Sequence, residues 1–167
     1  MLVEQFHAEF TNEFKGTRRV LDNVDFEKFD YKPHPKSFSF GHLTAHVANM
    51  PWWGLATLTA NEYHLTEADT NLDKSVPATK EEMMAKFDEN VAKFLETLKT
   101  MTEDQMHETW TMYFQGKPYF GIPRHVALRS SVMNHMIHHR AQLTVYLRMN
   151  DLRVPGLYGP SADDQKK

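Results

Sequence analysis

Apolar residues recur at helical spacing in four segments of this chain, and this periodicity constrains the fold more than any other feature. The segments cover residues 1 to about 23, about 39–60, 79–98 and about 123–149. Side chains three or four positions apart lie on one face of an α-helix, so each segment has an apolar face to bury. Four amphipathic helices joined by longer connections predict an all-α fold, a four-helix bundle.

Local signals mark where the helices begin and where one of them is interrupted. Residues 31–38 contain two prolines and are expected to form a loop. Ser37 or Ser39 can then cap the second helix. Pro51 lies inside that helix, and we expect a kink or break there because proline lacks an N–H and clashes with the preceding turn. Residues 79–82 have the sequence of a capping box and start the third helix.

The connections between the helices differ in character. Residues 61–78 are expected to form a connection. Residues 109–122 alternate large apolar side chains with Thr and Tyr before a turn at 115–118, which predicts either a short hairpin or an extended loop ahead of the last helix. This segment either caps the core or lines the mouth of a pocket, and capping is the favoured interpretation. The chain after Asn150 is expected to pack back on the bundle.

Composition and charge exclude several classes of protein. The 167 residues fit one domain spanning 1–167, and a net charge of −3 without a basic stripe argues against nucleic-acid binding. The absence of cysteine excludes disulfides, Cys-ligated zinc and a cysteine nucleophile. No segment approaches the ~18 apolar residues of a membrane span. The N-terminus lacks the basic start and apolar run of a signal peptide, so the cytoplasm is the expected location.

Two His-x-x-x-His pairs lie in the predicted second and last helices. Residues four apart in a helix differ by about 40° in direction, so His135 and His139 lie on one face. Leu128, Gln142 and Tyr146 fall on the same stripe, and its Leu and Tyr indicate that it faces inward, whereas His138 lies toward the edge of the stripe. His135 and His139 are therefore the better pair of ligands, and His138 can still contact a ligand or substrate.

The upstream pair supplies the next candidate. His46 stands between Ala45 and Val47, deep in the predicted second helix, and is the stronger third ligand. His42 lies near the start of that helix, where one end of the bundle opens. Its role is a fourth ligand, a group that supports another ligand, or none.

Two such pairs on packed helices can surround one metal ion. Neutral imidazole suits zinc, nickel, copper and iron, and bundles build metal sites from inward-pointing side chains. The Glu-x-x-His pattern of di-iron bundles and the His-Glu-x-x-His pattern of zinc proteases are both absent. We therefore expect a mononuclear three-His site with an open position, where a metal lowers the pKa of bound water or a bound thiol.

Two segments resemble a known family. Residues 134–148, Asn-His-Met-Ile-His-His-Arg-Ala-Gln-Leu-Thr-Val-Tyr-Leu-Arg, and residues 154–163, Val-Pro-Gly-Leu-Tyr-Gly-Pro-Ser-Ala-Asp, are similar to the closing segment of the DinB family of DinB/YfiT-like metalloenzymes. Residues 43–48, Leu-Thr-Ala-His-Val-Ala, resemble the second-helix motif of the same family. The resemblance extends over the whole chain in layout and is specific in these segments.

The resemblance implies an antiparallel four-helix bundle with a long crossover, often assembled as a homodimer. It also implies a divalent metal, nickel or zinc first and iron or manganese next, held by one histidine of the second helix and two of the last. These ligands correspond to His46, His135 and His139, in agreement with the stripe argument. His42 has no counterpart among the ligands of the family.

The family resemblance implies a general class of activity and does not identify a specific reaction. Some members are thiol S-transferases that use low-molecular-weight thiols such as bacillithiol or mycothiol, and others resemble a mycothiol-dependent isomerase. The resemblance thus implies a metal-dependent transferase or hydrolase with a small-molecule substrate. In such an enzyme, the candidates of this chain for proton transfer are His42, His138 and Tyr146. The alternatives are a non-catalytic stress-response protein that binds a metal or small ligand, and a helical interaction module.

Overall fold

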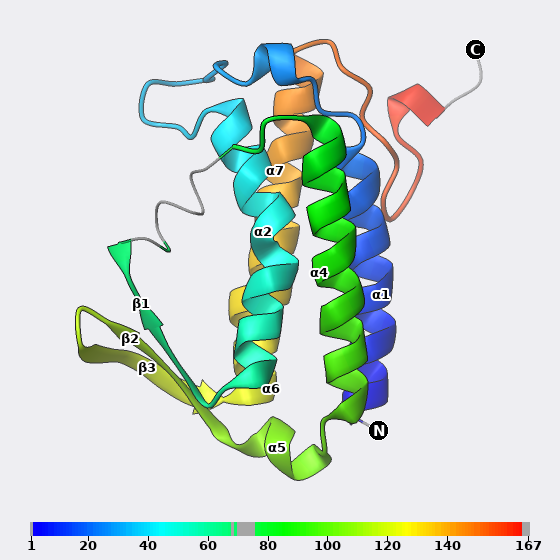
Figure 1. Cartoon of the computed structure of the whole chain (residues 1–167). Helices are drawn as coiled ribbons and strands as arrows, with labels where there is room; N and C mark the ends of the chain where they lie inside the picture. Colours follow the sequence, from blue (N-terminus) through cyan, green and yellow to red (C-terminus); the bar gives the residue numbers. More distant parts are fainter. Residues whose placement is uncertain (1, 68, 70–75, 165–167) are drawn as a thin grey trace.

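Four long helical segments lie side by side as a bundle (Figure 1). The computed structural model describes residues 2–67, 69 and 76–164. The long helices are α1 (Leu2–Leu21), α2 (Phe40–Thr59), α4 (Lys80–Thr100) and α7 (His135–Met149). In Figure 1, α1 and α7 run upward and α2 and α4 run downward. The predicted bundle and its long crossover are present, but α2 and α4 run parallel to each other, so the neighbours are not all antiparallel.

The last helical segment is not uniform. It begins with α6 (Arg124–Ala127), continues as a π-helix, η2 (Leu128–Asn134), and becomes the α-helix α7 at His135. The predicted helix over 123–149 is therefore confirmed in extent. Its π-helical turn, which is a wider turn often found at functional sites, was not predicted.

Helix starts agree with the sequence signals. The side chain of Ser39 accepts from the N–H of His42 at the start of α2, and Thr79 accepts from the N–H of Glu82 at the start of α4. Each bond satisfies a backbone donor that has no partner within its helix. Pro51 does not break α2, which is helical from Phe40 to Thr59.

A small three-stranded sheet flanks the lower end of α2, so the fold is mostly helical and a purely all-α bundle is not confirmed (Figure 1). The strands are β1 (Glu62–Leu65), β2 (Thr109–Phe114) and β3 (Lys117–Pro123). The hairpin alternative for 109–122 is confirmed. Gln115 and Gly116 form its turn with φ of 50° and 75°, and positive values at both central residues are typical of a type I′ hairpin turn. The predicted connection over 61–78 contains β1, which pairs with β2 in parallel.

Aromatic side chains fill the core between α1 and α4. Phe10 and Phe14 lie on one face of α1, and the ring of Phe94 on α4 packs edge-on against Phe14 at 5.4 Å between centroids. Gly54 lets α2 approach this cluster, because a Cβ atom there would stand 2.6 Å from the Phe94 ring. These contacts confirm the apolar helix faces.

Short elements and the tail complete the chain. They are η1 (Phe26–Lys28), α5 (Glu103–His107) and η3 (Ala162–Asp164). The tail packs back on the bundle as expected: Asp163 pairs with Arg148 of α7 at 2.8 Å, and the hydroxyl of Tyr158 donates to Glu13 of α1 at 2.8 Å. No helix in the described part of the chain is long and apolar enough to cross a membrane.

Candidate metal centre

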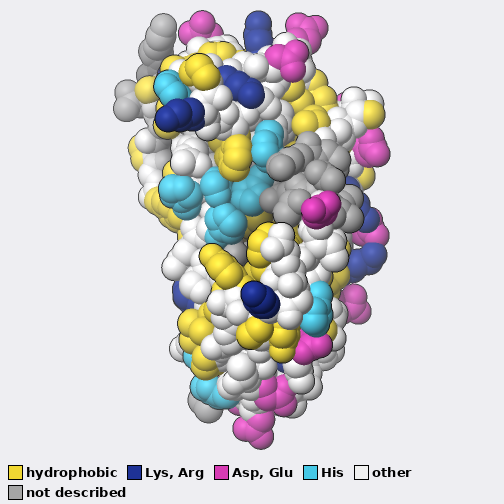
Figure 2. Space-filling model, turned by 90° about the vertical axis from the view of Figure 1, so that its left-hand side faces the viewer, with side chains coloured by type: hydrophobic (Ala, Val, Ile, Leu, Met, Phe, Trp, Pro, Cys, Tyr) yellow, Lys and Arg dark blue, Asp and Glu magenta, His cyan; other side chains and the backbone are white. Residues whose placement is uncertain are grey.

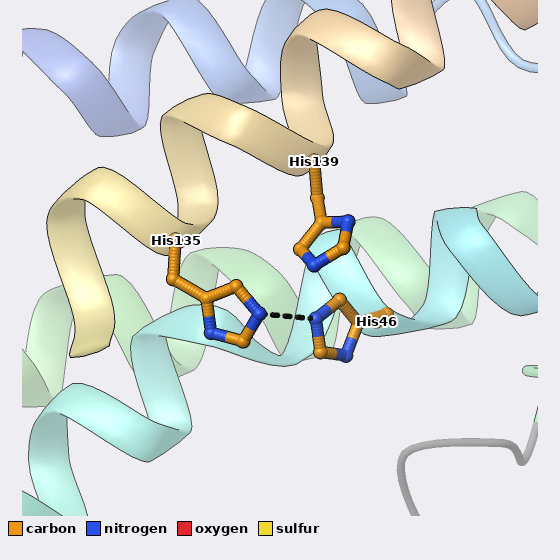
Figure 3. Close-up of side chains that lie close together, drawn as sticks. All are labelled: His46, His135 and His139. Atoms are coloured by element: carbon orange, nitrogen blue, oxygen red, sulfur yellow. Dashed lines mark hydrogen bonds between the residues drawn. The ribbon is translucent and has the colours of Figure 1, made fainter. Parts of the chain in front are cut away.

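Three histidines from two facing helices point toward one another (Figure 3). His46 comes from α2, and His135 and His139 come from successive turns of α7. One ring nitrogen of each lies within 4.8 Å of those of the other two, and the Nε2 atoms of His46 and His135 are 3.2 Å apart. The structure thus brings together the three residues that the sequence predicted as ligands.

The carbonyl of Ser131 sets the proton position on His135. His135 Nδ1 lies 3.3 Å from this oxygen, which can only accept, so Nδ1 carries the proton and Nε2 carries the lone pair. The backbone N–H of His135 donates to the carbonyl of Val132 at the end of the π-helical turn. The imidazole is therefore oriented by η2, the irregular part of its own helix.

Gln142 acts in the same way on His139. Its Oε1 lies 2.8 Å from His139 Nδ1 and accepts that proton, which leaves Nε2 as the lone-pair nitrogen. Burial, together with the neighbouring His46 and His135, lowers the pKa of His139 to about 4, against the raising effect of the hydrogen bond that its Nδ1 donates to Gln142. The imidazole is neutral at pH 7, as a metal ligand must be.

The donor set fits a divalent metal of the zinc or nickel kind. Two imidazole nitrogens on one tetrahedral metal at about 2.1 Å stand roughly 3.4 Å from each other. The 3.2 Å between His46 and His135 is close to that spacing. His46 is 7% exposed and the other two histidines are partly buried, so the three imidazoles are arranged to hold a common cation.

A large cavity adjoins the cluster on one side. Its volume is about 570 Å³, and His46, His135 and His138 contribute to its wall. The other walls come from α2, the sheet and the π-helical turn η2, and are mainly apolar: Met50, Trp53, Leu65, Trp110, Met112, Phe120 and Val132. On the face shown in Figure 2, histidine side chains gather in one patch with hydrophobic side chains around it.

A second, smaller cavity of about 370 Å³ reaches His139 from the loop before α2. It is lined by Lys36, Gln142 and Phe38 among others. Phe38 is 43% exposed, and its ring centroid lies 6.3 Å from those of both His46 and His139. The loop therefore forms a partial cover over the histidine cluster.

The other three candidate site residues, His42, His138 and Tyr146, lie outside the three-histidine cluster. The ring of His42 packs against Phe38 in a tilted arrangement at 4.2 Å between centroids, and His42 is outside the cluster of three that could hold one ion. His138 lines the large cavity next to His139, at 4.9 Å between ring centroids. Tyr146 donates its hydroxyl to the carbonyl of Phe38 at 3.1 Å, so it positions the loop.

The aromatic segment 109–122 lines a pocket, although the sequence favoured the interpretation that it caps the core. Trp110, Met112 and Phe120 line the large cavity, so this hairpin forms a wall of the cavity beside the candidate site. Trp53 of α2 faces them and packs at 5.2 Å against Tyr63 of β1. Sequence periodicity could not reveal these contacts, because they join segments far apart in the chain.

A helical bundle with a cluster of three histidines that could hold one metal ion has the arrangement from which metal sites in bundle proteins are built. The model of the DinB family matches residues 1–167, and the chain belongs to this family. The predicted resemblance is therefore confirmed over the whole chain.

Individual relatives are distant. The chain is 23% identical over 166 residues to the uncharacterized protein YrdA of Bacillus subtilis, covering 99% of this chain and 93% of YrdA. A DinB-like protein of Bacillus cereus is similar in structure, with a TM-score of 0.70, 24% identity and coverage of 93% of this chain and 97% of that one. YjoA, a DinB-like protein of Bacillus subtilis, is also similar in structure, with a TM-score of 0.68 and 17% identity. The match covers 94% of this chain and 99% of YjoA. These two structures support the fold.

Proposed function

We propose that this DinB-family chain is a metal-dependent transferase of the low-molecular-weight thiol S-transferase type. His46, His135 and His139 hold a divalent metal, nickel or zinc. The observation that carries the proposal is the position of the three histidines between two cavities, one mainly apolar and one with polar groups. A transfer reaction brings two substrates to one centre, and two separate approaches suit that requirement.

Each protein group has a definable task in this proposal. A bound divalent metal supplies Lewis acidity and lowers the pKa of a thiol or of water. Ser131 and Gln142 keep the Nδ1 protons of His135 and His139 in place, so both rings present Nε2. In this proposal the large cavity holds the second substrate, which accepts the thiol. Its apolar walls exclude water from that substrate, and His138 lies in the wall, where it can contact the substrate.

Two alternatives use the same site. A hydrolase needs one substrate cavity and a water molecule, so it leaves the second cavity without a task. A non-catalytic protein that binds a metal or small ligand needs no second substrate. The two-sided access to the cluster favours the transferase over both.

Elemental analysis tests the metal site. The untagged protein, incubated with zinc or nickel and then desalted, should retain about one metal per chain. The double variant His135→Ala, His139→Ala should retain none, and the matched control His138→Ala should retain the wild-type amount. Failure of the wild-type protein to bind either metal would reject the proposal and leave a helical interaction module.

Turnover separates the transferase from the binding protein. The probe is cysteine with chlorodinitrobenzene: sulfur forms a bond to the ring carbon, chloride leaves with the electrons of the carbon–chlorine bond, and the thiol proton passes to solvent. Metal-loaded wild-type protein should accelerate chloride release over the double variant. A metal-loaded protein with the same rate as the double variant would instead support the non-catalytic alternative.

A further inference from the structure

We propose that the large cavity binds an uncharged, mainly aromatic molecule, and that the β2–β3 hairpin selects it. The inference rests on the proposed function in so far as this molecule is the acceptor of the transferred thiol. The argument uses the chemistry of the cavity walls and is independent of the metal.

Size and wall chemistry point to a flat apolar ligand. About 570 Å³ lies within the range of roughly 300–1,000 Å³ typical of small-molecule sites. Trp53, Trp110 and Phe120 supply three aromatic surfaces, and Met50 and Met112 add flexible apolar side chains. Aromatic rings and methionine sulfur both make favourable contacts with another ring.

The aromatic walls are held in fixed positions. Trp53 packs at 5.0 Å against Trp52 and at 5.2 Å against Tyr63, and Trp110, which is 2% exposed, lies 6.0 Å from Phe120 between ring centroids. A preformed apolar site binds a ring without first having to order its own side chains. The cavity is therefore suited to a rigid ligand.

Charge disfavours anions in this cavity. Among the described residues that line it, none is Lys or Arg, and Asp69 is the one carboxylate. Burial alone would raise the pKa of Asp69, but hydrogen bonds from Thr66 and Tyr63 outweigh it and lower the pKa. In the metal-free protein, an ionised ligand group would enter a mainly apolar site that has no Lys or Arg among its described lining residues and would lie beside a negative charge, which is costly.

Two fluorescent probes with one aromatic framework test the inference. N-phenylnaphthylamine is uncharged, and anilinonaphthalene sulfonate adds one negative charge to the same rings. We expect the neutral probe to bind metal-free protein at one saturable site, at least about tenfold more tightly than the sulfonate. Equal or tighter binding of the sulfonate, or no saturable binding of the neutral probe, would overturn the inference.

A pair of adjacent residues places the probe in the cavity. Phe120 lines the cavity, whereas Tyr119, next to it in β3, is 73% exposed. Phe120→Ala should weaken binding of the neutral probe about tenfold through lost ring contact, and Tyr119→Ala should leave it unchanged. Met112→Ala repeats the test should Phe120→Ala fail to fold by circular dichroism. Equal effects of Phe120→Ala and Tyr119→Ala on binding of the neutral probe would show that the probe does not bind in this cavity.

The two proposals can fail separately. Saturable binding of the neutral probe by a protein that retains no metal would keep this inference as ligand binding and reject the proposed transferase. Stoichiometric metal without binding of the neutral probe would keep the metal site and reject the cavity ligand. Asp69→Asn adds a charge test: it should raise the affinity for the sulfonate relative to the neutral probe, and an unchanged ratio would remove Asp69 from the argument.

Discussion

At the residue scale, the proton positions of two imidazoles depend on oxygen acceptors in their own helical segment. Ser131 accepts from His135 through its backbone, and Gln142 accepts from His139 through its side chain. Only the second of these acceptors can be removed by substitution. The contribution of Gln142 is therefore directly measurable.

Substituting Gln142→Leu should lower zinc affinity by about 10–100-fold, because partners that orient a metal-bound histidine contribute on that scale. Leucine has a similar volume but cannot accept the Nδ1 proton of His139. The measurement is competition with a chelator of known zinc affinity. Gln5→Leu, which changes an exposed glutamine on α1, is the matched control and should retain wild-type affinity. Equal affinities for the two variants would show that Gln142 does not support a ligand.

The lowered pKa of His139 predicts a pH dependence of stability in the metal-free protein. Its pKa is about 4 in the folded state, because burial and the neighbouring His46 and His135 disfavour the charged form, and about 6.5 when unfolded. Between these values the unfolded chain binds more protons, so the free energy of unfolding falls as pH falls from about 6.5 to 4. Urea unfolding at several pH values across this range measures how steeply the free energy of unfolding changes with pH. This pH dependence should be weaker for His139→Asn than for the wild type, and an unchanged pH dependence would contradict the lowered pKa of His139.

At the element scale, the π-helical turn η2 changes the geometry that leads to His135. A step of 100° per residue describes an α-helix, whereas a π-helix bonds i to i+5 and turns less per residue. The sequence argument that placed Leu128 on the stripe of His135 used the α-helical step throughout. Leu128 is buried as that argument expected, but His135 is oriented by Ser131 within the wider turn. This turn also supplies Ser130 and Val132 to the cavity wall.

The crossing of α2 and α4 depends on Gly54. A Cβ at this position would lie 2.6 Å from the ring of Phe94, so Gly54→Ala should destabilise the protein by about 1–3 kcal/mol through overpacking. Helix propensity offsets this by up to about 1 kcal/mol. Thermal or urea unfolding measures the change.

A double-mutant cycle checks the cause of that loss. Phe94→Leu removes the ring that a Cβ at Gly54 would meet. The alanine substitution should therefore cost less in the Phe94→Leu background than in the wild type. If Gly54→Ala lowers the free energy of unfolding equally in both backgrounds, the destabilisation does not arise from contact with the Phe94 ring.

At the scale of the whole molecule, Arg124 connects the sheet to the bundle. It is 2% exposed, and its guanidinium donates to the carbonyls of Thr57 and Ala60 at the end of α2 and to the side chain of Asn61 before β1. It also donates to the carbonyl of Gln105 in α5 at 3.1 Å. One side chain thus ties three elements around the base of the cavity.

Arg124→Met should destabilise the fold by about 3 kcal/mol or more, since one buried and two partly buried carbonyls lose a donor. Hydrogen exchange of the amides in β2 and β3 should rise in the same variant. Arg129→Met, which removes an exposed ion pair with Glu9, is the control and should cost at most about 1 kcal/mol. Similar losses for both variants would contradict the anchoring role of Arg124.

Much of the element pattern could be predicted from the sequence, because it depends on neighbours in the chain. The helical rows, the caps at Ser39 and Thr79 and the shared face of His135 and His139 all follow from local spacing and local hydrogen bonds. The proximity of His46 was an inference from the bundle and the family resemblance. The strand β1 was missed because four residues carry too little periodicity to identify a strand.

The sequence by itself determined which segments are helical, which histidines share a face and which family the chain resembles, since these depend on short-range order. Only the tertiary structure decided that β1 joins β2, that η2 widens the helix before His135, and that a cavity separates the hairpin from α2. The reason is physical: a cavity and a parallel strand pair arise between segments some fifty residues apart, and their formation depends on how whole faces pack rather than on local periodicity.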